Sequence, residues 1–370
     1  VDKADKSGKT PFDIAIEHQN HRIVDLILDI TNIDIDKTDK FGRTLLQDAV
    51  ILGDHEMARI LLNYGADINA KDNKNRNVLF DALSYGNEEF IDYLLSFEEL
   101  NLNTVDSEQN SIMHHNFVKE NEEIAIKLIE HGADPTIKNK NGNTFLCDSA
   151  LRGMDGFNVV EIAIKKGCNI NSRVADENSI LIELVTAASA LSDDEIDRRK
   201  SLLKMTEELI VQGIDINAVN DNNENALFQA VKVDDIEQVA MLLGSGIEVN
   251  LQNNDGETPL SLTSYGGIEK LDMLILLLKY NADPTILNKN SKTLFEVLNE
   301  IILSNHDKKE LVNNDILKYA LSGSKFIHVL KEILKYNKRD LNFLDSTGRP
   351  LFFMPLLHNS IILFKLYVKS

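Results

Sequence analysis

The pattern of apolar and polar positions is clearest in residues 39–71, which predict two short amphipathic helices after a tight turn. Asp39 and Gly42 predict the turn, because an Asp side chain accepts bonds from nearby backbone N–H groups and Gly tolerates a positive φ. Thr44 begins the first helix with a Thr-x-x-Gln capping box, and Asp54 begins the second. The apolar residues recur at helical spacing: Leu45, Leu46, Ala49, Val50 and Leu52, then Met57, Ala58, Leu61 and Leu62. Neither helix can bury its apolar stripe alone, so further copies must stack on this unit.

The same turn and helix pair recur along the chain and predict an all-α fold of stacked repeats. Equivalent turns begin at ten positions: Asp5, Asp39, Asp72, Asp106, Asn139, Val174, Asn220, Asn253, Asn288 and Asp345. Successive turns are 33 to 35 residues apart, except for 46 residues in the sixth copy and 57 in the ninth. We therefore expect a single solenoid domain over residues 1–370, built from helix–turn–helix units with hairpin-like fingers.

The chain resembles the ankyrin repeat family in its period and at both ends of the repeat. The turn and helix start of that family are matched in the first copy by Asp5, Gly8, Thr10 and Pro11, and in the eighth by Asp255, Gly256, Thr258, Pro259 and Leu260. Its G-A-D end is matched by residues 65–69 and 132–135. The resemblance implies a protein-interaction scaffold, whose concave face is lined by the turn tips and the exposed side of each first helix.

Three copies depart from the regular pattern. In the fourth copy Gln109 takes the place of the turn glycine. The sixth copy carries an insertion near 191–201, where Ser192 to Glu195 form a second capping box that predicts an extended or additional helix. The ninth copy has an insertion near 303–325 that predicts an extra helix. Insertions in repeat proteins either add binding specificity or are tolerated loops.

The chain begins and ends inside the repeat pattern. Residues 1–4 align with the tail of a repeat, and the last copy stops before a G-A-D element. We expect a fragment of a longer protein. The last copy is densely apolar: Leu351, Phe352, Phe353, Leu356, Leu357, Ile361, Ile362, Leu363, Phe364, Leu366 and Tyr367. Because terminal repeats need a polar outer face, we expect this end to continue into further sequence or to be buried in an end-to-end dimer.

The charge balance narrows the classes of partner. The chain has 59 acidic and 39 basic side chains, a formal net charge of −20. That charge repels phosphate backbones and anionic lipid surfaces, so we expect neither a nucleic-acid nor a membrane partner. No apolar run is long enough for a membrane span. Cys147 and Cys168 are expected to be small buried side chains, and nothing indicates an oxidising compartment. We expect an intracellular, cytoplasmic protein, with a secreted effector as the open alternative.

The sequence shows no catalytic constellation. It contains no P-loop, no G-x-S-x-G elbow, no H-E-x-x-H and no C-x-x-C pair, so we expect neither an enzyme nor a cofactor. His114 and His115 are the only adjacent histidines, and Asp81, Cys147 and Asp148 occupy the matching positions of neighbouring copies. A polar residue at this place is ordinary in the family, so no metal site is expected.

The repeat register identifies side chains that share one surface. The second position after the Leu of each first helix is expected to be exposed: Ile14, Asp48, Asp81, His115, Asp148, Glu183 and Gln229. Four of the five residues from Asp48 to Glu183 are acidic. The turn tips are basic or polar and include Lys40, Arg43, Asn73, Lys74, Arg76, Lys140 and Asn141.

We therefore expect a protein partner to be bound in the second to sixth copies. The hypothesis is an acidic floor that receives a basic segment, with these charge anchors: Asp48, Asp81, Asp148 and Glu183. His115 lies in the same row, and Phe41 and Tyr85 are expected to add exposed aromatic contacts beside Arg43 and Arg76. The alternative is that these charges are merely solvated.

Two functions remain open from the sequence. The chain is either a scaffold whose activity is to present this surface, or the recruiting arm of a larger enzyme or secreted effector whose active domain lies elsewhere. Fold alone does not choose between them.

Overall fold

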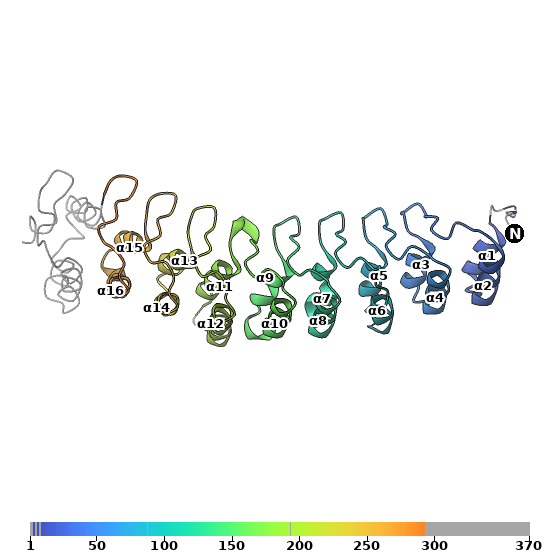
Figure 1. Cartoon of the computed structure of the whole chain (residues 1–370), viewed down its shortest axis with the longest axis horizontal. Coiled ribbons are helices and arrows are strands. Elements are labelled where there is room, and N and C mark those ends of the chain that lie inside the picture. Colours follow the sequence, from blue (N-terminus) through green and yellow to red (C-terminus); the bar gives the residue numbers. More distant parts are fainter. Residues whose placement is uncertain (1–2, 4–5, 7–8, 87, 193, 293–370) are drawn as a thin grey trace, which may run out of the picture. The chain divides into compact units, whose positions relative to one another are not determined.

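The chain folds into helix pairs, with an extended finger between one pair and the next (Figure 1). The structure, a computed structural model, describes the following residues: 3, 6, 9–86, 88–192 and 194–292. Among them the only β-type pairing is an isolated bridge between Val105 and Ser111. The predicted all-α repeat fold is therefore confirmed. The insertion near 303–325 and the apolar terminal copy, with its expected dimer contact, lie outside the described residues.

The chain divides into two compact units, unit 1 (Val1–Ala175) and unit 2 (Asp176–Ser370). The prediction that residues 1–370 form one domain stays a prediction. Among the described residues, no helix is both long enough and apolar enough to cross a membrane.

Unit 1 contains five helix pairs. Its helices are α1 (Pro11–Glu17), α2 (His21–Ile30), α3 (Leu45–Ile51), α4 (His55–Asn63), α5 (Val78–Tyr85), α6 (Glu88–Leu95), η1 (Ile112–His114), α7 (Asn116–Glu120), α8 (Glu122–Glu130), α9 (Phe145–Ala150), η2 (Gly153–Gly156) and α10 (Phe157–Lys165). Each first helix packs against its own second helix, and α3, α5 and α7 pack side by side. Their apolar stripes meet in a core that fully buries residues such as Leu46, Leu61, Leu79 and Ile91.

In the described part of unit 2 three further pairs follow the short helix η3 (Ala175–Glu177), which begins at the last residue of unit 1. They are α11 (Ile180–Ser189) with α12 (Ile196–Val211), α13 (Ala226–Lys232) with α14 (Ile236–Gly244), and α15 (Pro259–Leu262) with η4 (Thr263–Lys270) and α16 (Leu271–Lys279). Phe228, Leu227 and Leu209 are fully buried between these pairs.

The predicted helix signals of the second copy are present. The Thr44 hydroxyl accepts from the Gln47 N–H at 3.4 Å, and the Gln47 side chain accepts from the Thr44 N–H at 3.2 Å, so the capping box is complete. Asp54 caps α4 by accepting from the Met57 N–H at 3.0 Å. One prediction for this copy is wrong: Leu52 ends the first helix and is 69% exposed instead of joining the core.

The finger turn keeps one backbone conformation in every described copy. Its fourth residue has a positive φ each time: Gly42 (76°), Asn75 (63°), Gln109 (61°), Gly142 (79°), Glu177 (52°), Asn223 (58°), Gly256 (71°) and Ser291 (55°). Gln109 therefore leaves the turn of the fourth copy intact. That copy departs elsewhere, because its first helix is split at His115 into η1 and α7. The backbone of His115 is extended and its ring caps α7 by accepting from the Phe117 N–H at 3.3 Å.

The first residue of the turn holds the finger together. Asp39 accepts from the N–H groups of Phe41 at 2.7 Å and Arg43 at 2.9 Å, and most described copies repeat this pair of bonds. The sixth copy has Val174 at this position, and a valine side chain accepts no hydrogen bond. The division between the two units follows one residue later, after Ala175.

Asparagine side chains at the end of several repeats link consecutive copies. Asn69 donates to the Glu99 carbonyl and accepts from the Asn101 N–H, both at 2.7 Å. The same two-way bonding recurs at Asn103 in unit 1 and at Asn250 in unit 2. These bonds satisfy backbone groups in the loops, where no helix ladder is available.

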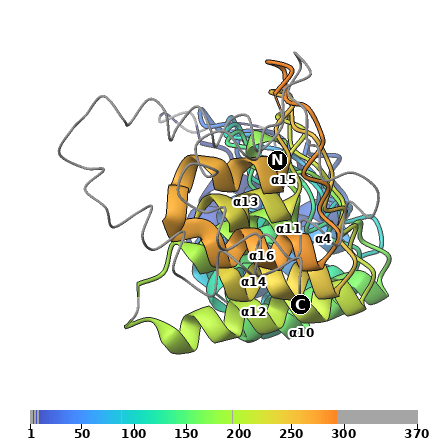
Figure 2. The ribbon, with the colours of Figure 1, turned by 90° about the vertical axis from the view of Figure 1, so that its left-hand side faces the viewer.

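The insertion of the sixth copy lengthens the second helix, which confirms the extension and excludes a separate helix. Helix α12 begins at Ile196 and extends past its neighbour α14 (Figure 2). In place of a full capping box, the Ser192 hydroxyl donates to Glu195 at 2.9 Å. Arg199, on the added turns, is fixed by Asp235 at 2.7 Å and Glu237 at 2.8 Å.

Candidate partner-binding face

The first helices of unit 1 carry two rows of side chains, which together we call the first-helix face. The inner row holds the predicted positions Asp48, Asp81, His115 and Asp148. The outer row lies four residues further along each copy: Leu52, Tyr85, Lys119 and Arg152. Residues four apart on a helix lie on the same side. Helices α3, α5 and α7 pack side by side, and Lys119 on α7 pairs with Asp148 on α9, so the rows cross from the second copy to the fifth.

In the second copy the finger reaches the inner row through Arg43. Its guanidinium pairs with Asp39 at 3.1 Å and with Asp48 at 3.4 Å, and it lies 5.1 Å from the centre of the Phe41 ring. Lys40 stacks on the same ring at 4.9 Å. Phe41 is 53% exposed. Burial raises the pKa of Asp48 while Arg43 lowers it. Asp48 is thus half-buried and already has a cation beside it.

In the third copy the expected exposure of Asp81 is wrong. Asp81 is only 4% exposed, and its carboxylate accepts from the Gln47 amide of the preceding copy at 3.2 Å. Burial raises the pKa of Asp81 to about 6, against the lowering effect of Arg76 and of the Gln47 bond. Arg76 itself pairs with Asp72 at 2.6 Å. A buried and partly neutral carboxyl makes a poor anchor for a basic partner.

The remaining inner-row residues of unit 1 are also engaged by the protein. Lys119 pairs with Asp148 at 2.9 Å. His115 is half-buried, its Nε2 lies 3.2 Å from the Ser84 hydroxyl, and burial lowers its pKa. At neutral pH the ring is therefore uncharged.

Glu183 belongs to unit 2. It lies on α11, is half-buried, and accepts from the Asn178 amide at 2.8 Å. The acidic-floor hypothesis stays a prediction. The structure weakens its physical basis, because Asp48, Asp148 and Glu183 have intramolecular partners and Asp81 is buried.

The outer row was missed by sequence reasoning, apart from Tyr85. Leu52 is 69% and Tyr85 is 58% exposed, in consecutive copies whose first helices touch. The next two copies present cations at the same position. Arg152 is exposed and donates only to backbone carbonyls, those of Lys119 at 3.4 Å and Asp155 at 3.5 Å. The repeat register could have identified the outer row, because its residues lie one helical turn, four residues, after the predicted row in each copy.

Most of the exposed carboxylates on the helices of unit 1 lie on the second helices, and three others, Asp13, Glu17 and Glu120, lie on first helices. Exposed carboxylates lie on the second helices at Asp25, Asp29, Glu56, Glu88, Glu89, Asp92, Glu123 and Glu130. On the first-helix face, by contrast, the carboxylates are paired or buried. The sequence predicted the total charge and not its distribution.

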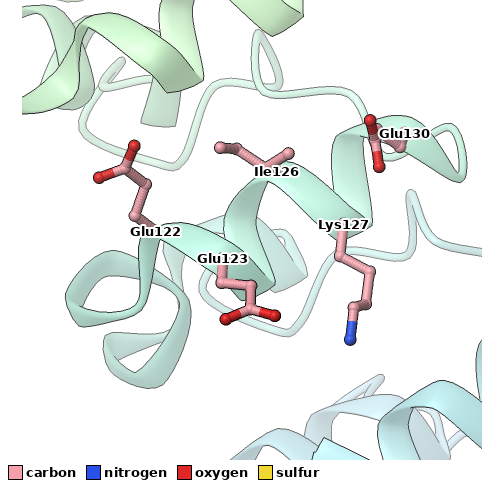
Figure 3. Close-up of a pocket in the computed structure, with 5 residues that line it drawn as sticks. All are labelled: Glu122, Glu123, Ile126, Lys127 and Glu130. Atoms are coloured by element: carbon pink, nitrogen blue, oxygen red, sulfur yellow. The ribbon is translucent and has the colours of Figure 1, made fainter.

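A shallow hollow of about 510 Å³ lies over α8. Residues of that one helix line it: Glu122, Glu123, Ile126, Lys127 and Glu130. The side chains diverge to two sides of the helix instead of converging on a common point (Figure 3). Lys127 is held by Asp92 at 2.6 Å. The hollow therefore has no arrangement suited to binding a small molecule.

No metal site was expected, and the described residues contain no group of three or more His, Cys, Asp or Glu side chains placed to hold an ion. His114 supports the fold: its Nδ1 accepts from the Ser111 N–H at 3.2 Å and its Nε2 lies 3.1 Å from the Asn143 carbonyl of the next copy. Cys147 is buried, Cys168 is half-buried, and neither of them forms a disulfide.

The fold and this face define a class, that of helical repeat proteins. Comparison with known proteins then identifies the family. The profile of ankyrin repeats, in three copies, matches residues 1–72, 79–174 and 198–288, more than half of the chain. The chain belongs to the ankyrin repeat family. Ankyrin repeats generally act as protein–protein interaction modules and are typically non-catalytic.

Several known proteins are similar to this chain. An ankyrin repeat protein of Fowlpox virus is 31% identical over 126 residues, 34% of this chain and 29% of that protein. The nuclear factor NF-kappa-B p105 subunit of Gallus gallus is 26% identical over 264 residues, 69% of this chain and 25% of that protein. The E3 ubiquitin-protein ligase KEG of Arabidopsis thaliana is 22% identical over 296 residues, 78% of this chain and 18% of that protein. The matched part thus covers less than a third of each of these relatives.

Proposed function

We propose that this chain is a protein-interaction scaffold that binds its partner on the first-helix face of unit 1. The observation that carries the proposal is the exposed pair Leu52 and Tyr85, at the same register position in adjacent copies, with exposed Phe41 on the finger of the same copy as Leu52. Large apolar and aromatic side chains that form one exposed patch are typical hot spots of protein interfaces. Arg43 connects the finger to the helix, because it contacts both Phe41 and Asp48.

A comparative pull-down from an extract of the protein's own cells tests this proposal. The bait is the chain itself, the double variant Leu52→Asp, Tyr85→Asp, and a control variant, Leu26→Asp, on α2. Leu26 is 57% exposed, so the control adds one of the two negative charges of the double variant, at a similar depth but away from the face. We expect at least one protein to be retained by the chain and by the control and lost from the double variant. Identical recovery with all three baits would contradict the proposed face.

The second candidate function is that of a recruiting arm within a larger protein. The observation in its favour is the length of the relatives, one of which is named as an E3 ubiquitin-protein ligase and is matched over only 18% of its length. The complete open reading frame tests it. A catalytic domain beside these 370 residues would support the recruiting role, and a reading frame made of ankyrin repeats alone would contradict it.

A further inference from the structure

The outer row of the first-helix face changes its chemistry along unit 1. The second and third copies present Leu52 and Tyr85, which are apolar and more than half exposed. The fourth and fifth copies present Lys119 and Arg152. The row therefore has an apolar half and a cationic half.

The charges of the inner row compensate Lys119 in part and leave Arg152 uncompensated. Asp148 is shared with Lys119 at 2.9 Å, and this is a half-exposed pair, which an incoming carboxylate can reach. Arg152 donates to two backbone carbonyls, and among the described residues no carboxylate forms an ion pair with it. Asp81 is buried and Asp48 is occupied by Arg43. An approaching basic side chain finds no unpaired carboxylate in these two rows, whereas an acidic side chain finds Arg152.

The length of the row sets the length of its occupant. Adjacent packed helices are about 8–10 Å apart, so three steps from Leu52 to Arg152 span roughly 25–30 Å. An extended peptide advances about 3.3 Å per residue and covers that distance in roughly eight or nine residues. The apolar anchor lies between Leu52 and Tyr85, so the acidic residues that reach Lys119 and Arg152 would be about four to eight residues away from it.

We propose that the first-helix face of unit 1 binds a segment of a partner protein that carries a large apolar side chain followed by acidic side chains. The apolar side chain packs between Leu52 and Tyr85, and the acidic side chains pair with Arg152 and Lys119. This inference rests on the proposed function and specifies the chemistry of the partner. It reverses the charge expected of the partner from the inner row alone.

Selection of random 12-residue peptides displayed on phage, with the chain as the immobilised target, tests the inference. We expect the enriched peptides to combine Leu, Ile, Phe, Tyr or Trp with Asp or Glu about four to eight residues away. Enrichment of basic peptides, or no enrichment of the apolar and acidic combination, overturns the inference.

The strongest enriched peptide is then labelled and its dissociation constant is measured by fluorescence anisotropy. We expect Arg152→Glu to weaken binding at least tenfold, and Leu52→Ser with Tyr85→Ser to abolish it. The control Arg22→Glu makes the same charge change at an exposed position on α2 and is expected to leave binding unchanged. Circular dichroism of each variant confirms that it is folded.

The outcomes separate this inference from the proposed function. If the peptide no longer binds the Leu52 and Tyr85 variant but binds Arg152→Glu as tightly as the original chain, the acidic specificity is wrong and the binding face is still supported. Peptides indifferent to both changes overturn the inference and the face together. Sedimentation of the chain alone completes the test: self-association that Leu52→Ser abolishes would assign the face to a second copy and overturn the inference.

Discussion

The second and third copies of the repeat place the same kind of residue at the same register position and give it different environments. Asp48 is half-buried and pairs with Arg43, whereas Asp81 is 4% exposed and contacts Gln47 of the preceding copy. The two fingers are alike, because each holds an Arg–Asp pair four residues apart. The difference arises from the preceding copy: Gln47 of the second copy reaches forward to Asp81, whereas the first copy has Asp13 at the position equivalent to Gln47. Register predicts which side chains share a row, and the adjacent copy decides which are exposed.

Charge reversal at the two positions is expected to give the largest difference in stability between them. Asp81→Lys places a cation in a buried site and is expected to lower the free energy of unfolding by about 3–5 kcal/mol. Asp48→Lys, at a half-exposed position, is expected to cost no more than about 1 kcal/mol. Urea denaturation followed by circular dichroism measures both. Equal losses at the two positions would show that Asp81 is not buried.

This contrast also affects the test of the acidic floor. A partner-binding assay with Asp81→Lys would confuse unfolding with loss of a contact, so Asp48→Lys with Asp148→Lys is the better variant. If a basic partner exists, that variant should weaken its binding.

The second prediction concerns pH. The pKa of Asp81 is raised from 3.8 to about 6, so the folded chain holds this proton over a range where the unfolded chain has released it. The stability of the folded chain therefore falls as the pH rises from about 4 to about 6, because ionised Asp81 is less favourable in its buried site than in water. Above pH 6 this loss is complete. We expect Asp81→Asn to gain about 3 kcal/mol relative to the wild type between pH 4 and pH 8, since one pKa unit corresponds to about 1.4 kcal/mol. Asp48→Asn provides the matched comparison, with a smaller change expected. A difference between Asp81→Asn and wild type that does not vary with pH would contradict the raised pKa.

The smallest effects are expected in the turn that both copies share. A Cβ at Gly42 would lie 2.5 Å from the Asn73 side-chain oxygen and 2.8 Å from its backbone nitrogen, at a φ of +76°. Gly42→Ala is therefore expected to cost about 2 kcal/mol. Gln109→Gly, at the same position in the fourth copy, should instead gain up to about 1 kcal/mol, because glycine relieves the left-handed strain. Thermal unfolding of both variants measures these shifts, and a stabilising Gly42→Ala would contradict the turn geometry.

Much of the fold could be predicted from the sequence because its signals are local. The turn begun by Asp39, the capping box of Thr44 and Gln47, and the start of α4 at Asp54 each depend on a few consecutive residues. The lengthening of α12 followed from the apolar and capping pattern of the insertion in the same way. These features are set before any repeat meets its neighbour.

The candidate site could be predicted only in part because it depends on contacts between copies. Phe41 and Tyr85 are exposed as expected. The burial of Asp81 depends on Gln47 of another copy, and the exposure of Leu52 depends on where α3 ends. His115 was expected on the exposed side of a helix, yet it interrupts that helix and caps the next one. The pairing of Asp148 required Lys119 from the preceding copy.

The asparagines that link consecutive copies have a consequence for how such a chain can change in length. Asn69, Asn103 and Asn250 each donate to the following copy and accept from it, so three of the described junctions are completed by the same residue on the same side. Duplication or loss of one complete repeat of this kind would keep the asparagine bonds at the new junction. A break inside a repeat would instead leave an asparagine without its partners in the next copy. The insertion of the sixth copy respects this rule, because its extra residues fall between α11 and α12, away from any junction. Such a chain can gain or lose copies by recombination without redesign of the contacts that remain.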